Sequence, residues 1–214
     1  MRGIFCLEGL WDEDLEEKYS VYPLLTMLEM YSKAPFMHHR VATTGELDFY
    51  LSKWKESCFK NYPILYFAFH GESGMILIGS EKYTLKKLSE KLKDSCTDAF
   101  IFLASCRTVN VEDELIRLFL QRTGAKGVFG YRNRVVWIFS AAVEILLLSE
   151  IQNAEISSQG LSTLRRRVDH ICKNFNRTDV LFATEKRIQI VGKSTSEFPM
   201  HVKKKSFKRK RSGM

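Results

Sequence analysis

No apolar run in this sequence is long enough to cross a bilayer. The longest, residues 135–148, has 14 residues and includes Glu144, whereas a membrane-spanning helix needs roughly 18 to 20 apolar residues. We interpret this run as a buried helix. The apolar run at the N-terminus is also too short for a secretory signal, and acidic residues follow it directly. These absences predict a soluble, cytoplasmic protein without a transmembrane segment.

The sequence also lacks the spacings with which cysteine and histidine bind metals. Its five cysteines form no C-x-x-C pair, and their odd number favours a reduced, intracellular chain over a disulfide framework. His38, His39, His170 and His201 show no metal-ligand spacing, so we interpret them as structural or surface residues. Neither a P-loop nor a G-x-G-x-x-G motif is present. We therefore expect no metal, nucleotide or other cofactor.

Positive charge is concentrated at the C-terminus. The formal net charge is +8, but residues 203–211 hold seven of the 33 basic residues, which leaves 26 basic and 25 acidic residues elsewhere. We predict one compact domain over residues 1–193 and a basic, disordered tail over 194–214. The tail fits a nuclear import signal if the chain is eukaryotic, an arm for nucleic acid or an anionic membrane, or an ordinary solvated terminus.

Short apolar runs rich in β-forming residues alternate with longer segments of helical period. This alternation is typical of an α/β protein with a mostly parallel central sheet, here of about six strands. The predicted strands are residues 3–8, 37–42, 64–69, 99–104, 127–131 and 180–184.

The segments between the strands carry helix start and stop signals. Thr43 and Glu46 form a possible capping box, and Thr84 precedes a second apolar stripe. Asn110 is the predicted N-cap of a helix that Gly124 would end. We interpret one further stripe at helical spacing as core packing rather than as a partner site: Leu161, Leu164, Val168, Ile171 and Phe175.

A histidine and a cysteine stand at the ends of two predicted strands. His70 follows residues 64–69 directly, and Cys106 follows 99–104 after one serine. If these strands are parallel neighbours, both side chains face the sheet edge at which α/β proteins place functional groups. A thiol and an imidazole there could perform nucleophilic acyl transfer, and Gly71 could let a substrate carbonyl approach a backbone N–H. A buried structural cysteine and a structural histidine remain the alternative.

The wider pattern resembles the caspase-like cysteine peptidases, which include caspases, metacaspases and the CHAT-type peptidases of bacteria. "FAFHGESGMILIG" resembles the caspase pattern in which H-G-E-x-G leads through a small hairpin to another glycine, and "AFIFLASCRT" resembles the strand that ends in A-C-R-G. "TGAKGVFGYRNRVVWIFSAAVE" is similar to the CHAT pattern of Gly-Ala, a short strand and a long apolar helix. The resemblance implies a three-layer α/β/α sandwich.

The resemblance also implies roles for individual residues. Cys106 would be the nucleophile and His70 the general acid/base. The backbone N–H groups of Gly71 and Cys106 would form the oxyanion hole. No metal and no third catalytic side chain would be required. The substrate would be a protein or peptide.

Departures from the caspase pattern bear on the P1 residue, after which the substrate is cleaved. Ala104 stands where caspases have a glutamine that helps to bind a P1 aspartate, and the loop after residues 3–8 lacks the arginine that caspases supply there. Arg107 and Thr108 follow Cys106 where caspases have Arg-Gly. The resemblance therefore does not carry aspartate specificity over to this chain.

Many relatives outside the caspases place acids around this pocket and cleave after Arg or Lys. Glu8, at the end of the first predicted strand, is the best placed carboxylate, and Asp12 is a weaker second candidate, for which a solvated surface is the favoured interpretation. Arg132 would instead suit an acidic substrate. We predict a basic P1 residue, with these three side chains as substrate-binding candidates.

Two other functions compete with a peptidase. The chain could be a caspase-like interaction module in which Cys106 and His70 persist without turnover, or a nucleic-acid-associated protein that acts through its basic tail. If it is a peptidase, we expect an active single chain. The connection from Cys106 to residues 127–131 is short and mostly helical, so it offers no long linker to be cut.

Overall fold

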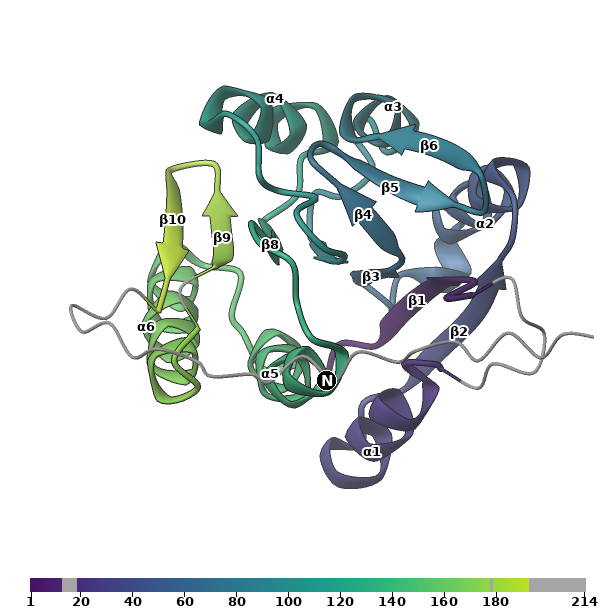
Figure 1. The fold of residues 1–214 in the computed structure, drawn as a ribbon. Coiled ribbons are helices and arrows are strands. Elements are labelled where there is room, and N and C mark those ends of the chain that lie inside the picture. The colour runs from purple at the N-terminus through teal and green to yellow at the C-terminus, as the bar shows by residue number, and fades with distance from the viewer. Residues whose placement is uncertain (13–18, 178, 193–214) are drawn as a thin grey trace, which may run out of the picture.

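The structure is a computed structural model, and it describes residues 1–12, 19–177 and 179–192 (Figure 1). The basic tail predicted for 194–214, with the charge run at 203–211, lies outside the described residues, so the contacts proposed for it stay predictions. Within the described part of the chain, no helix is long and apolar enough to cross a membrane.

A central sheet of seven strands runs through the middle of the molecule. Its order is β10-β9-β8-β7-β3-β1-β2. The pairs from β8 to β2 are parallel, whereas β9 pairs antiparallel with both β8 and β10. The strands are β1 (Ile4–Gly9), β2 (Phe36–Val41), β3 (Ile64–Ala68), β7 (Phe100–Ala104), β8 (Gly127–Tyr131), β9 (Val180–Thr184) and β10 (Arg187–Val191).

The mostly parallel sheet expected from the sequence is confirmed. All six predicted strands are present, with ends shifted by one residue at most. β10 was not predicted, and it is an edge strand whose side chains are mostly half-buried or exposed. Its sequence lacks the continuous apolar run that identifies the buried strands.

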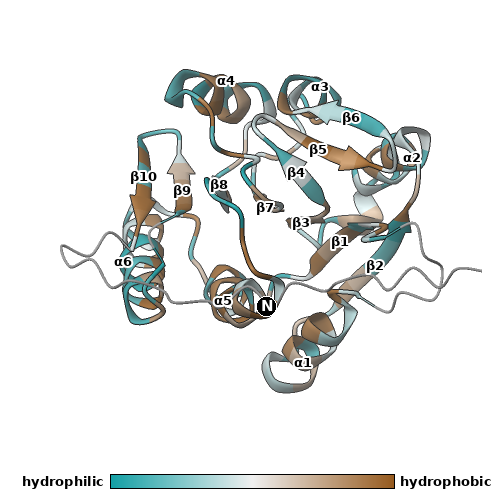
Figure 2. Ribbon diagram, viewed as in Figure 1, coloured by the Kyte–Doolittle hydropathy of each residue, from teal (hydrophilic) through white to brown (hydrophobic). Residues whose placement is uncertain are grey.

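Helices cover both faces of the sheet and complete a three-layer sandwich (Figures 1 and 2). One core lies between the sheet and α2, α3 and α4, and the other between the sheet and α1, α5 and α6. Alternate residues of each strand contribute to the two cores, because successive side chains point to opposite faces. The helices are α1 (Tyr22–Ser32), α2 (Thr44–Trp54), α3 (Leu85–Lys91), α4 (Asp113–Thr123), α5 (Trp137–Gln152) and α6 (Ser158–Asn174), with a 3-10 turn η1 (Ser57–Phe59) after α2.

A second, three-stranded antiparallel sheet follows β3. It consists of β4 (His70–Glu72), β5 (Met75–Ile78) and β6 (Glu81–Thr84). Ile76, Ile78 and Tyr83 anchor it in the core shared with α2, α3 and α4. The hairpin thus begins at His70 itself, so the local structure of that residue is tied to the body of the domain.

Most of the predicted helix signals are confirmed, and one is wrong. Thr43 closes a capping box with Glu46, and Thr84 caps α3. Gly124 ends α4 with φ 74, which a residue without Cβ adopts easily. Asn110, however, is not the N-cap of α4, which begins at Asp113 after Glu112. The backbone N–H of Asn110 instead bonds to the Arg107 carbonyl, in the turn that follows Cys106.

Candidate active site

Strand register brings His70 and Cys106 to the same level of the sheet. β3 and β7 are parallel neighbours, and Ala68 pairs with Ala104. His70 and Cys106 each follow their alanine by two residues. The condition set by the sequence analysis is therefore met, because both residues stand at the carboxyl edge of adjacent parallel strands.

His70 and Cys106 line one cavity of about 180 Å³. Trp11 from the segment after β1, Trp137 from the first turn of α5 and Glu144 from the middle of α5 also line it. His70 is exposed and Cys106 is half-buried, whereas Glu144 is only 4% exposed. Among the lining residues, the histidine and the cysteine are thus open to solvent, whereas the acid is buried.

The sulfur of Cys106 is held against the segment that leads into α5. The backbone N–H of Val135 donates to Cys106 Sγ at 3.4 Å, and Sγ lies 4.0 Å from the Val135 carbonyl oxygen. Arg107, the next residue, has φ 58, a left-handed conformation that is uncommon for residues other than glycine. Cys106 therefore sits at a sharp turn directly after β7.

Gly71 packs directly on this turn. A Cβ at position 71 would lie 2.3 Å from Thr108 Oγ1, 2.7 Å from the Cys106 carbonyl oxygen and 2.8 Å from Ser105 Cβ. Only glycine fits at this separation, because real Cβ atoms essentially never approach other atoms that closely. The sequence analysis explained Gly71 by the approach of a substrate. The structure adds that Gly71 lets the β4–β5 hairpin contact the Cys106 turn.

A backbone carbonyl fixes the His70 ring. Nε2 of His70 lies 2.8 Å from the Trp11 carbonyl oxygen, and the Trp11 and His70 rings meet edge to face with centroids 5.3 Å apart. Because a carbonyl oxygen only accepts hydrogen bonds, Nε2 carries the proton in this contact, which leaves Nδ1 of a neutral ring as the base. Sequence reasoning could not find this partner, since any residue type supplies a carbonyl.

Glu8 is fully buried in the structure and does not line this cavity. Its carboxylate accepts hydrogen bonds from Trp11 Nε1, Ser20 Oγ, the Val21 backbone N–H and His38 Nε2, at 2.6 to 2.8 Å. Burial acts to raise the pKa of Glu8, but these hydrogen bonds, that from His38 first among them, outweigh it and lower the pKa below its ordinary value.

The other two substrate-binding candidates also lie outside this cavity. Asp12 is exposed and is not among the residues that line it. Arg132 forms an ion pair with Asp113 at 2.7 Å and lines a different cavity, beside β10. The structure thus brings together Cys106, His70 and Gly71, and places Glu8, Asp12 and Arg132 elsewhere.

Glu144 is the acid that the sequence analysis did not propose for this site. The hydroxyls of Tyr66 and Tyr131 both donate to its carboxylate, the latter at 2.9 Å. Burial raises the pKa of Glu144 more than these two hydrogen bonds lower it. A signal was available, because Glu144 interrupts the longest apolar run of the chain, and acids are almost never fully buried without a partner.

No group of three or more His, Cys, Asp or Glu side chains suited to a metal ion occurs among the described residues. All five cysteines are free. His39 stacks on Tyr50 with ring centroids 4.4 Å apart, and His170 is exposed on α6.

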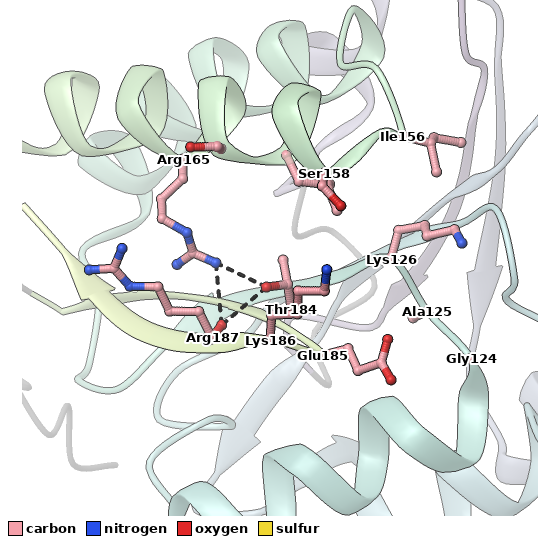
Figure 3. A pocket seen from close by; sticks show the side chains of 12 residues that line it. Gly124, Ala125, Lys126, Ile156, Ser158, Arg165, Thr184, Glu185, Lys186 and Arg187 are labelled. Carbon is pink, nitrogen blue, oxygen red and sulfur yellow. Dashed lines mark hydrogen bonds between the residues drawn. The ribbon is translucent and has the colours of Figure 1, made fainter.

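A separate cavity of about 320 Å³ lies at the opposite edge of the sheet, between α6, the start of β8 and the β9–β10 turn (Figure 3). Arg165 reaches across it and donates to the Phe182 carbonyl, Thr184 Oγ1 and the Arg187 carbonyl. Its guanidinium is thus bound to the chain itself. The reactive side chains at the other edge make the smaller cavity the candidate active site.

Comparisons with known proteins agree with this architecture. A family model described as "Family of unknown function (DUF6642)" matches residues 2–178. No curated protein matches the sequence. Among solved structures, caspase-1 from Spodoptera frugiperda is similar with a TM-score of 0.54 and 13% identity over 92% of each chain.

A secreted C11 cysteine protease from Bacteroides thetaiotaomicron, solved with an irreversible peptide inhibitor, is similar with a TM-score of 0.51 and 8% identity over 86% of this chain and 66% of that one. At these identities the likeness establishes the caspase-like fold.

Proposed function

The chain belongs to the DUF6642 family, and we propose that it is a cysteine endopeptidase that cleaves protein substrates with a Cys106/His70 dyad. One observation carries this proposal. The parallel pairing of Ala68 with Ala104 puts an exposed imidazole and a half-buried thiol into one cavity, at the sheet edge where α/β folds place their sites. The caspase-like fold supports it.

In the proposed reaction, His70 Nδ1 takes the proton of the Cys106 thiol, and the thiolate sulfur attacks the scissile carbonyl carbon. The carbonyl oxygen becomes an oxyanion, which the backbone N–H groups of Gly71 and Cys106 would stabilise. His70 then gives its proton to the leaving amine as the C–N bond breaks and a thioester remains. Water, deprotonated by His70, hydrolyses the thioester and restores the thiol.

We further propose that the P1 residue is basic and that Glu144, rather than Glu8, selects it. Glu144 lines the cavity, whereas every oxygen of Glu8 is occupied by internal donors. A guanidinium or ammonium group beside a buried carboxyl favours its ionised form and would offset the effect of burial on the pKa of Glu144. Trp137 and Val135 would contact the apolar stem of the P1 side chain.

Labelling with electrophilic peptides tests the proposal. Peptide chloromethyl ketones that end in Arg, Lys, Asp or Leu, which lose chloride as the sulfur is alkylated, are incubated with the protein, and the labelled residue is identified by mass spectrometry. We expect labelling of Cys106 by the Arg and Lys probes, and its complete loss in Cys106→Ala. Cys58, which is exposed but remote from the dyad, is the matched control, so that Cys58→Ala should label normally. Intact protein that no probe labels and that cleaves no peptide would instead indicate an interaction module.

A further inference from the structure

We propose that Glu8 and His38 are positioning residues for His70, because together they hold the Trp11 carbonyl against the imidazole. This inference rests on the proposed peptidase function. It assigns to Glu8 a role different from the substrate binding suggested by the sequence, and it gives His38 a role in the same reaction.

The Glu8 carboxylate contacts Trp11, which follows β1, and Ser20 and Val21, which precede α1. Oε1 accepts hydrogen bonds from Trp11 Nε1 at 2.6 Å and from the Val21 N–H at 2.8 Å. Oε2 accepts one from Ser20 Oγ at 2.6 Å. Trp11 is the residue whose carbonyl meets His70 Nε2. One carboxylate therefore connects the anchor of the His70 ring to the start of α1.

His38 supplies the fourth donor from the neighbouring strand. Its Nε2 lies 2.6 Å from Glu8 Oε2, and the two side chains are 13% and 0% exposed. On the same strand, Arg40 donates to the Tyr19 carbonyl at 3.2 Å, which adds a second tie between β2 and this segment. The position of Trp11 is thus set by a contact with Glu8 of β1, which is itself bonded to His38 of β2.

This arrangement needs an acceptor at position 8 and a donor at position 38. A carboxylate offers only acceptor sites, and all four of its contacts are donors. A glutamine would turn an NH₂ group towards two of them, so these donors would have to shift. The reacting atoms of a dyad must be held closely, since a displacement of about 1 Å can cost on the order of 100-fold in rate. The lowered pKa of Glu8 is consistent with this carboxylate being ionised at neutral pH.

Three substitutions test the inference. Glu8→Gln should lower the rate of Cys106 labelling between about 10- and 100-fold. His38→Leu, which removes one donor and leaves the carboxylate in place, should have a smaller effect. His38→Gln keeps an N–H donor and should label close to the wild-type rate. Glu150→Gln, which breaks an exposed ion pair with Arg167, is the matched control and should be neutral.

A spectroscopic measurement separates this inference from the proposed function. In protein with ¹⁵N-labelled histidine, the ring nitrogen shifts of His70 report its tautomer, with His70→Ala used for assignment. We expect the Nε2–H form in the wild type and in His38→Gln, and a mixture of tautomers in Glu8→Gln. Thermal melting shows whether each variant is folded. If His38→Leu is the only folded variant, its His70 ring shifts decide the question. A mixture of tautomers supports the inference, and an unchanged Nε2–H form overturns it.

The inference is overturned if folded Glu8→Gln keeps both the Nε2–H form and the wild-type labelling rate, or if His38→Gln is as slow as His38→Leu. If no probe labels the wild type, the proposed function fails. The tautomer of His70 still shows whether Glu8 controls it.

Discussion

Glu8 and Glu144 are two buried acids on the same side of the sheet, with opposite surroundings. Glu8, at the end of β1, meets four donors from three segments, and its pKa is lowered. Glu144, in the middle of α5, meets two tyrosine hydroxyls beside a cavity, and burial raises its pKa. The number of donors decides whether a buried carboxyl is stable as an anion. A carboxyl with spare acceptor capacity next to a cavity can bind a ligand, and one without such capacity can only support structure.

The largest expected difference between the two acids is in stability. Glu8→Gln leaves buried donors without an acceptor, at about 1–3 kcal/mol each, so we expect a loss on the order of 3 kcal/mol in the free energy of unfolding. Glu144→Gln should change it by only about 1 kcal/mol, because the amide oxygen can accept from one tyrosine while the hydroxyl of the other rotates to accept from the amide NH₂, and an unfavourable buried charge is removed. Urea titrations of both variants measure this, with Glu150→Gln as the control. Equal losses of unfolding free energy in Glu8→Gln and Glu144→Gln would show that the two carboxyls do not differ in their contribution to stability.

The next effect concerns substrate preference. Glu144→Gln should reduce the preference for an Arg probe over a Leu probe by about 10- to 100-fold, since a buried charge-assisted contact is lost. Glu8→Gln should slow both probes alike, because its carboxylate does not line the cavity. Ratios of labelling rates give the preference directly. Asp12→Asn and Arg132→Ala serve as controls and should leave the ratio unchanged. A fall in the ratio for either would return the specificity to the residues first suggested by the sequence.

The smallest effect is the pH dependence of stability, and its sign differs between the two acids. The folded pKa of Glu8 lies below the ordinary value of 4.5, so its stabilisation is present above 4.5 and is lost as the pH falls towards the folded value. The folded pKa of Glu144 lies above 4.5, so the folded state binds the extra proton and stability falls as the pH rises from 4.5 towards the folded value.

The free energy of unfolding, measured between about pH 3 and 8 in steps of about half a pH unit, resolves the two opposite slopes. Glu8→Gln should flatten the acid limb, and Glu144→Gln should flatten the decline above 4.5. If the same limb changes in both variants, the two carboxyls do not differ in the way the contacts imply.

The elements that could be predicted from the sequence are those whose formation depends on residues close together in the chain. Strands β3 and β7 follow from apolar runs, and the caps at Thr43 and Gly124 follow from residues within one turn. Sequence reasoning also placed His70 and Cys106 at strand ends, because the runs stop there. It failed at Asn110, where a good N-cap residue is used in the turn after Cys106 instead. In that case hydrogen bonds of the Asn110 backbone, to Arg107 in the turn and from Ser73 Oγ of the hairpin, overrode a local preference.

The sequence by itself determined the mostly parallel α/β architecture and the positions of His70 and Cys106 at strand ends, because periodicity and strand ends are properties of neighbouring residues. Only the tertiary structure decided what each acid does. Glu8 meets His38 and Ser20, and Glu144 meets Tyr66 from a strand far away in the chain. The chemistry of a carboxyl group depends on its burial and on the donors around it, and long-range packing sets both.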